Sequence, residues 1–147
     1  MDLPESLTID KILNTPGAAF RAVLQEENEK FRFYFIVNLD PQNQDRLLML
    51  TATSRIESVR NKFPEEVLVL IKKSDFPNLE RDSLINCEMA RVKLKKQLRK
   101  SLLKAKENGK LLFLDPLPES LLLKVRSAIA KCKTIPPIDK KLAVAED

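Results

Sequence analysis

The chain has 147 residues, no histidine, two cysteines and a formal net charge of +5, which is the size of one domain with its own hydrophobic core. The lack of histidine excludes the commonest metal ligand and proton shuttle, and the isolated Cys87 and Cys132 exclude a Cys-x-x-Cys site or a disulfide framework, so we expect reduced thiols. No apolar run approaches the roughly 20 residues that span a bilayer, and MDLPESLTID lacks the pattern of a signal peptide, so we expect a cytoplasmic protein without membrane attachment, metal or cofactor.

The first third of the chain predicts a short helix and then strands. Residues 4–13 can form the helix, and GAAFRAVLQ (17–25) a short strand. FRFYFIV (31–37) packs aromatic and β-branched residues together, which is typical of a strand buried on both faces. Turn formers separate it from RLLMLTATS (46–54), so we predict a hairpin with a long loop.

Further short strands and two longer helices follow. Residues 54–64 can make one or two helical turns, and strands are predicted at EVLVLIK, SLINCE, MARVKLK and KLLFL. Leu98, Leu102 and Ala105 share one face of a helix that ends at Asn108-Gly109. DPLPESLLLKVRSAIAKC gives the clearest helical spacing, near the C-terminus.

These elements predict one mainly β domain of the α+β class. Five or six short strands near positions 18–114 favour a small β-barrel. A short N-terminal helix, a basic helix and a C-terminal helix would lie at its periphery. We assign residues 1–133 to this domain with its N-terminal extension, and residues 134–147 to a flexible tail.

The positive charge is concentrated in one segment. Residues 89–110 hold nine Lys/Arg and one Glu, a net charge of +8, so the rest of the chain carries −3 of the total of +5. One basic element on a mildly acidic body indicates an anionic partner such as RNA, and a solvated helix face is the alternative. The candidate nucleic-acid contacts are Lys93, Lys95, Lys96, Arg99, Lys100 and Lys104.

Carboxylates and an arginine stand at the start of the buried strand. In EENEKFRF, Glu27 and Glu29 precede Arg32. The guanidinium fork fits phosphate oxygens, and a carboxylate can take a proton from a hydroxyl. Such a pair would suffice to cleave RNA through its own 2′-hydroxyl without a metal. Solvated charges at a strand end are the simpler interpretation.

The phrase TATSR (51–55) places short hydroxyl side chains where the next strand ends. Thr53 and its neighbours could hold a phosphate or a base edge. Ordinary strand threonines followed by a serine helix cap are the alternative interpretation.

The order of these features resembles the PemK/MazF family of toxin endoribonucleases. The pieces that carry the likeness are GAAFRAVL, QEENEKFRFYFIV, LLMLTATS and LERDSLINCE, followed by VKLKKQLRKSL, NGKL and LPESLLLKVRSAIAK. The family shows a Glu and then an Arg before a hydrophobic strand, a Thr/Ser-rich strand end, and an Asp-Ser stretch leading to a basic segment, a glycine and a closing helix. The likeness covers about residues 17–132, and DSLINCE with the basic segment is its most specific part.

The resemblance implies an SH3-like barrel and a metal-independent endoribonuclease acting on single-stranded RNA. It implies Glu27 as general base, with Glu29 as the alternative, Arg32 as general acid and phosphate anchor, and Thr53 as phosphate ligand. It also implies a homodimer with RNA in a groove between subunits and an antitoxin that masks this groove. A barrel that binds nucleic acid or protein without cleavage, and a structural subunit, are the other readings.

Overall fold

The computed structural model describes residues 5–24 and 30–145. In chain order its elements are α1 (Glu5–Leu13), β1 (Ala19–Ala22), β2 (Arg32–Ile36), η2 (Pro41–Asn43), β3 (Arg46–Thr53), α2 (Ile56–Arg60), η3 (Glu65–Val67), β4 (Leu68–Ile71), β5 (Ser83–Asn86), η4 (Cys87–Met89), β6 (Arg91–Leu94), α3 (Lys95–Glu107), β7 (Leu111–Phe113), α4 (Glu119–Lys131) and α5 (Pro137–Lys140). Each strand and longer helix expected from the pattern is present, and α5 is an addition.

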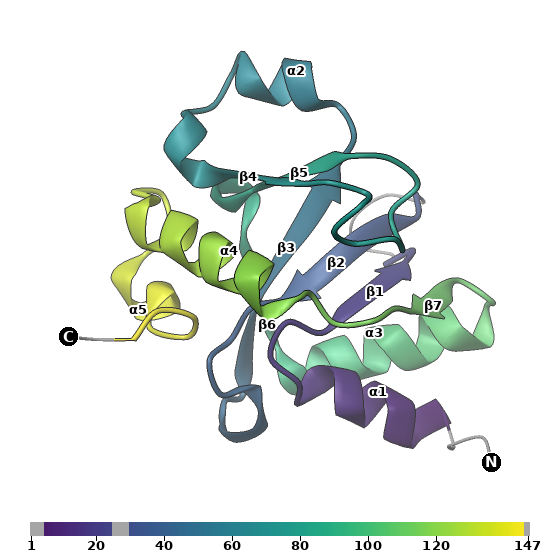
Figure 1. The fold of residues 1–147 in the computed structure, drawn as a ribbon. Helices are drawn as coiled ribbons and strands as arrows, with labels where there is room; N and C mark the ends of the chain where they lie inside the picture. Colours follow the sequence, from purple (N-terminus) through teal and green to yellow (C-terminus); the bar gives the residue numbers. More distant parts are fainter. Residues whose placement is uncertain (1–4, 25–29, 146–147) are drawn as a thin grey trace.

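The seven strands form one antiparallel sheet, in which six follow the order β4-β5-β3-β2-β1-β7 and the seventh, β6, pairs with β3. The strand β3 is the longest, and its two halves have different partners on one edge. Residues Arg46–Met49 pair with β6, whereas Ala52 and Thr53 pair with β5. The short turn η4 joins these two partners, so the sheet bends sharply along β3 (Figure 1).

The α+β class is confirmed, but the prediction of a closed barrel is wrong. The strands β4 and β7 end the sheet on opposite sides, and the described residues give no pairing between them. The curved sheet instead packs around α4, whose Leu121, Val125 and Ile129 share one core with Phe35 and Leu50. Closure of the sheet would need β4 and β7 to meet, and α4 occupies the concave side that such a closed sheet would enclose.

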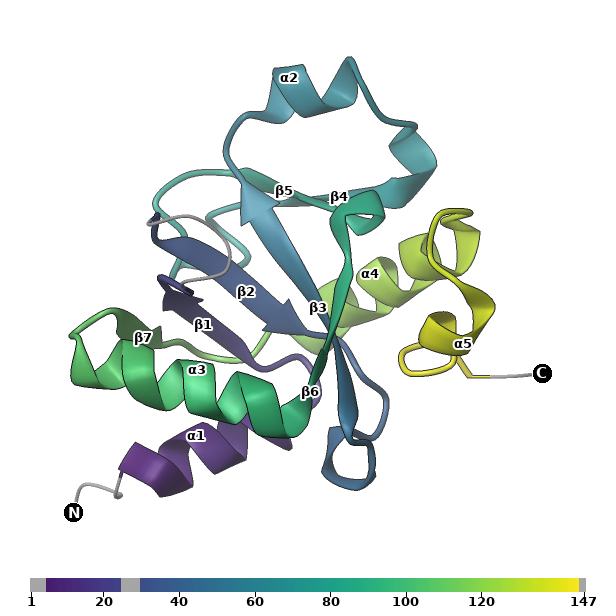
Figure 2. The same cartoon turned by 180° about the vertical axis from the view of Figure 1, so that it is seen from behind.

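A second core lies on the opposite face of the sheet. Successive side chains of a strand point to opposite faces. Accordingly, Tyr34 and Ile36 of β2 pack with α1 and α3, whereas Phe33 and Phe35 pack toward α4. Helices α1 and α3 therefore cover one face and α4 the other (Figures 1 and 2), which explains why FRFYFIV shows no polar alternation.

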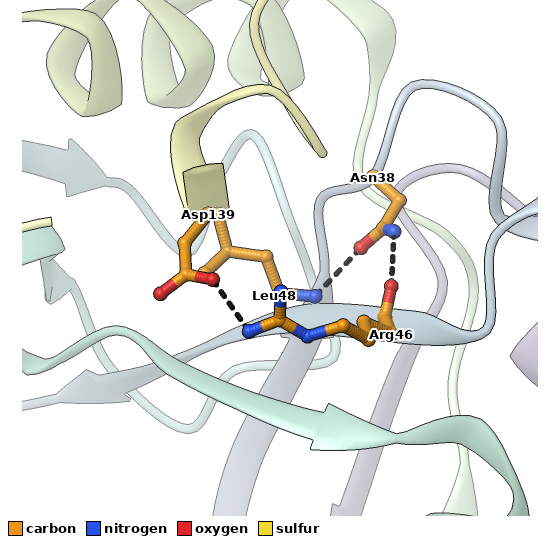
Figure 3. A network of polar contacts seen from close by, with 4 residues as sticks. All are labelled: Asn38, Arg46, Leu48 and Asp139. Atoms are coloured by element: carbon orange, nitrogen blue, oxygen red, sulfur yellow. Dashed lines mark hydrogen bonds and ion pairs between the residues drawn. The ribbon is translucent and has the colours of Figure 1, made fainter. Parts of the chain in front are cut away.

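The segment after α4, predicted as a flexible tail, contacts the body of the protein. Ile135 and Ala143 are buried, and the N–H of Leu39 donates to the carbonyl of Leu142 at 2.8 Å. Arg46 binds Asp139 of α5 at 2.7 Å (Figure 3). Residues 135–143 therefore pack against the body of the protein.

The loop between β2 and β3 is organised by one buried amide. The side chain of Asn38 is fully buried; it donates to the carbonyl of Arg46 at 2.9 Å and accepts from the N–H of Leu48 at 2.7 Å (Figure 3). This satisfies both ends of the amide, so the long loop leaves the strands in a fixed direction.

Among the described residues, no helix has the length and apolar content needed to cross a bilayer.

Candidate functional site

A pocket of about 360 Å³ opens at one edge of the sheet. It lies where β1 and β3 end and where β2 and β5 begin. Its described lining contains five basic side chains and one acidic side chain, together with hydroxyl and aromatic groups. These residues are Arg21, Lys30, Phe31, Arg32, Phe33, Ala52, Thr53, Ser54, Arg55, Glu80, Arg81 and Ser83.

The strand register brings two of the three predicted catalytic residues together. Phe33 pairs with Ala52 across β2 and β3, so the preceding Arg32 comes level with the following Thr53. Both side chains line the pocket. The third predicted residue, Glu27, and its alternative Glu29 lie outside the described residues.

Arg32 carries a hydrogen-bond donor that its described surroundings leave unused. Its Nε is buried and has no hydrogen-bond partner among the residues that the structure describes. A buried donor without a partner costs about 1–3 kcal/mol, more when it is charged. An anionic ligand in the pocket would remove this cost, because a guanidinium binds phosphate oxygens through parallel N–H donors.

Arg21 is a second arginine of the pocket, which the sequence reasoning missed. It donates to Glu80 at 2.9 Å, and its guanidinium carbon lies 5.0 Å from the ring centre of Phe33 and 5.5 Å from that of Phe31. The available signal was its position in the strand AFRA, where one charged residue interrupts apolar neighbours. Glu80 comes from the loop between β4 and β5, and no local pattern marks it.

Three hydroxyl groups complete the lining. Oγ1 of Thr53 accepts from the backbone N–H of Arg55 at 3.2 Å, which leaves the hydroxyl proton of Thr53 available for an anion. In contrast, Oγ of Ser83 donates to the carbonyl of Arg81 at 3.1 Å. Thr53 is therefore the better oriented donor of the two.

The predicted basic contacts do not all face solvent. Lys95 binds Oδ1 of Asn14 and the carbonyl of Pro41, and Arg99 binds Asp10 at 2.8 Å. These two cations join α3 to α1 and to the β2–β3 loop. In contrast, Lys96, Lys100 and Lys104 are exposed, while Lys93 is half-buried on β6. None of these six lines the described pocket.

The pocket is chemically suited to a phosphodiester. Five cations of the described lining give it a positive potential, and arginine forks hold phosphate with defined geometry. Glu80 is the one carboxylate of that described lining, and it is engaged by Arg21. Residues 5–24 and 30–145 contain no group of three carboxylate or cysteine side chains that could hold a metal ion.

Comparison with solved structures identifies a protein of similar fold. No protein-family model matches the chain, and no curated protein matches it either. Among solved structures, an endoribonuclease in complex with its cognate antitoxin, from a mycobacterial species, matches with a TM-score of 0.51 and 15% identity. The match covers 82% of this chain and 95% of that chain. At the level of the fold, the resemblance expected from the sequence is confirmed: this chain shares its architecture with that solved endoribonuclease.

Proposed function

We propose that this protein is a toxin-type endoribonuclease that cleaves single-stranded RNA without a metal ion. The observation that carries the proposal is the buried Nε of Arg32, which has no hydrogen-bond partner among the described residues and lies in a cationic pocket shared with Thr53. The likeness in fold to a solved endoribonuclease supports it.

In the proposed reaction the substrate supplies its own nucleophile. A carboxylate, Glu27 or alternatively Glu29, takes the proton of the RNA 2′-hydroxyl, and the 2′-oxygen attacks the adjacent phosphorus. Arg32 and Thr53 hold the charged phosphorane that forms when the 2′-oxygen attacks and that collapses as the P–O5′ bond breaks. The leaving 5′-oxygen takes a proton from Arg32, so the products are a 2′,3′-cyclic phosphate and a 5′-hydroxyl.

Partner proteins belong to the same proposal. The solved endoribonuclease was determined with its cognate antitoxin, and we propose that an antitoxin also masks the RNA site of this chain. We further propose a cytoplasmic homodimer with RNA bound in a groove between the subunits. Analytical ultracentrifugation of the purified protein checks the dimer.

The test of catalysis is cleavage of a labelled single-stranded RNA in EDTA. We expect cleavage by the wild type and a loss of at least 100-fold in rate for Arg32→Ala, the usual size of a lost transition-state contact. Arg60→Ala is the matched control, because Arg60 is an exposed arginine on α2 that does not line the pocket. Glu27→Gln and Glu29→Gln, measured separately, decide which carboxylate is the base.

A second candidate is a protein of this fold that binds nucleic acid without cutting it. The cationic lining and the exposed ring of Phe31 favour binding of a nucleic acid, and neither depends on a catalytic general base. In that case RNA is retained at low salt, is released as salt rises, and stays intact.

If Arg32→Ala and Glu27→Ala both cut as well as wild type, the catalytic assignment is wrong. A protein that shows no salt-dependent binding is a structural subunit.

A further inference from the structure

The exposed ring of Phe31 stands at the mouth of the pocket, directly before β2. Its exposed fraction is 41%, whereas Phe20, Phe35 and Phe76 are at most 2% exposed. Burying a phenylalanine side chain stabilises a protein by about 1.5–3 kcal/mol. Phe31 largely forgoes that gain, although its neighbour Phe33 packs into a core.

The ring of Phe31 lies against a cation of the pocket. The guanidinium of Arg21 lies against Phe31 and Phe33 and is itself fixed by its ion pair with Glu80. A planar guanidinium over an aromatic face is favourable and restricts the motion of both groups. Phe31 is thus oriented in advance beside the pocket.

Phe31 is also the immediate neighbour of the proposed phosphate anchor. Phe31 and Arg32 line the same pocket, so a nucleotide whose phosphate contacts Arg32 has its base within reach of Phe31. Single-stranded nucleic acids are recognised by such a combination, in which cations follow the backbone and aromatic rings stack on the bases.

We propose that Phe31 is a stacking platform for one unpaired nucleobase next to the phosphate held by Arg32. This inference rests on the proposed binding of a nucleic-acid strand in the pocket, and it holds whether or not the strand is cleaved. The alternative ligand for an exposed ring is an apolar side chain of a protein partner. The cations Lys30, Arg55 and Arg81 around the pocket favour the base, because they suit a polyanion.

The experiment compares two oligonucleotides that differ only in their bases. Fluorescence anisotropy measures binding of a labelled 2′-O-methyl RNA, which cannot be cleaved, and of an abasic strand of equal length and charge. Phe31→Ala should weaken binding of the strand with bases roughly 5- to 150-fold, the range for loss of one stacked base. It should leave binding of the abasic strand unchanged, and Phe31→Trp should retain the binding of the first strand.

Leu123→Ala is the matched control. Leu123 is 57% exposed on α4 and does not line the pocket, so its removal should change neither affinity. Thermal unfolding of each variant confirms that the fold is kept. The stacking platform is overturned if Phe31→Ala weakens the binding of both strands equally or the binding of neither. In that case, salt-dependent binding by the wild type still supports the proposed function. A wild type that binds neither strand overturns both.

Discussion

A buried thiol shows how one residue can make the stability of the fold depend on pH. Cys87 is fully buried in the core beneath α4. Burial, with a smaller effect of the neighbouring Cys132, raises the pKa of Cys87 from 9.0 to about 12. Burial disfavours the thiolate, so the folded protein holds the protonated form. Below pH 9 the thiol is mostly protonated in the folded and in the unfolded protein alike, so ionisation of Cys87 lowers the stability little there.

We predict that the free energy of unfolding falls as pH rises from about 9 toward 12. In this window the thiol ionises in the unfolded chain but not in the folded protein, which favours unfolding. The slope contributed by Cys87 is at most about 1.4 kcal/mol per pH unit. Urea unfolding between pH 9 and 11 measures it, and Cys87→Ala should have the shallower slope. Parallel profiles for the two proteins would show that Cys87 does not titrate as described.

The residues of the candidate site differ in how far the sequence reveals them. Arg32 and Thr53 stand at the ends of recognisable strands, and neighbouring antiparallel strands bring such ends together. Arg21 and Glu80 are 59 residues apart, and their contact depends on how the loop after β4 folds back. No local pattern encodes that path, so the contact between Arg21 and Glu80 emerges only from the tertiary structure.

At the scale of elements, the basic side chains of α3 that were predicted to bind nucleic acid fall into two groups with different tasks. Lys95 and Arg99 bind α1 and the β2–β3 loop, whereas Lys96, Lys100 and Lys104 face solvent. Helical periodicity predicted the buried face of Leu98, Leu102 and Ala105 correctly. It did not reveal the ion pair with Asp10, because that depends on α1 packing beside α3.

We predict that the exposed lysines of α3 assist RNA binding through charge alone. Changing Lys96, Lys100 and Lys104 to Gln should lower affinity at low salt and reduce the salt slope by up to about 0.7 per lost phosphate contact. The matched control changes the exposed Lys72, Lys124 and Lys131, on the side of α4 and β4, by the same total charge. Filter binding at several salt concentrations measures both variants. Equal effects of the two triple variants would indicate a general charge effect and no role for α3.

For the whole molecule, the strands and helices were readable from periodicity but the closure of the sheet was not. Aromatic density in β2 identifies a strand because it reflects burial, and the alternating sequence of β6 also identified a strand although the burial of that strand does not alternate. Whether β4 and β7 pair depends on the curvature of the entire sheet and on where α4 docks. Both glycines, Gly17 and Gly109, adopt positive φ at turns outside the strands, so neither relieves a strand bend.

The C-terminal segment offers a test of the overall packing with two isoleucines. Ile135 is 6% exposed and Ile138 is 64% exposed. We predict that Ile135→Ala lowers the free energy of unfolding by about 2–4 kcal/mol, whereas Ile138→Ala changes it by less than about 0.5 kcal/mol. Chemical denaturation measures both variants. Two variants as stable as wild type would mean that this segment does not pack on the body in solution.

The pairing of β1 with β7 has a consequence for the order of events at the ribosome. Phe20 lies opposite Phe113, so β1 is synthesised well before its partner strand β7. Helix α4 is synthesised later still, and it completes the core above β2 and β3. Contacts so distant in sequence form slowly and only after most of the chain exists. The nascent polypeptide therefore cannot complete this architecture until α4 has been synthesised, and a chain interrupted before residue 119 lacks the helix that fills its concave core.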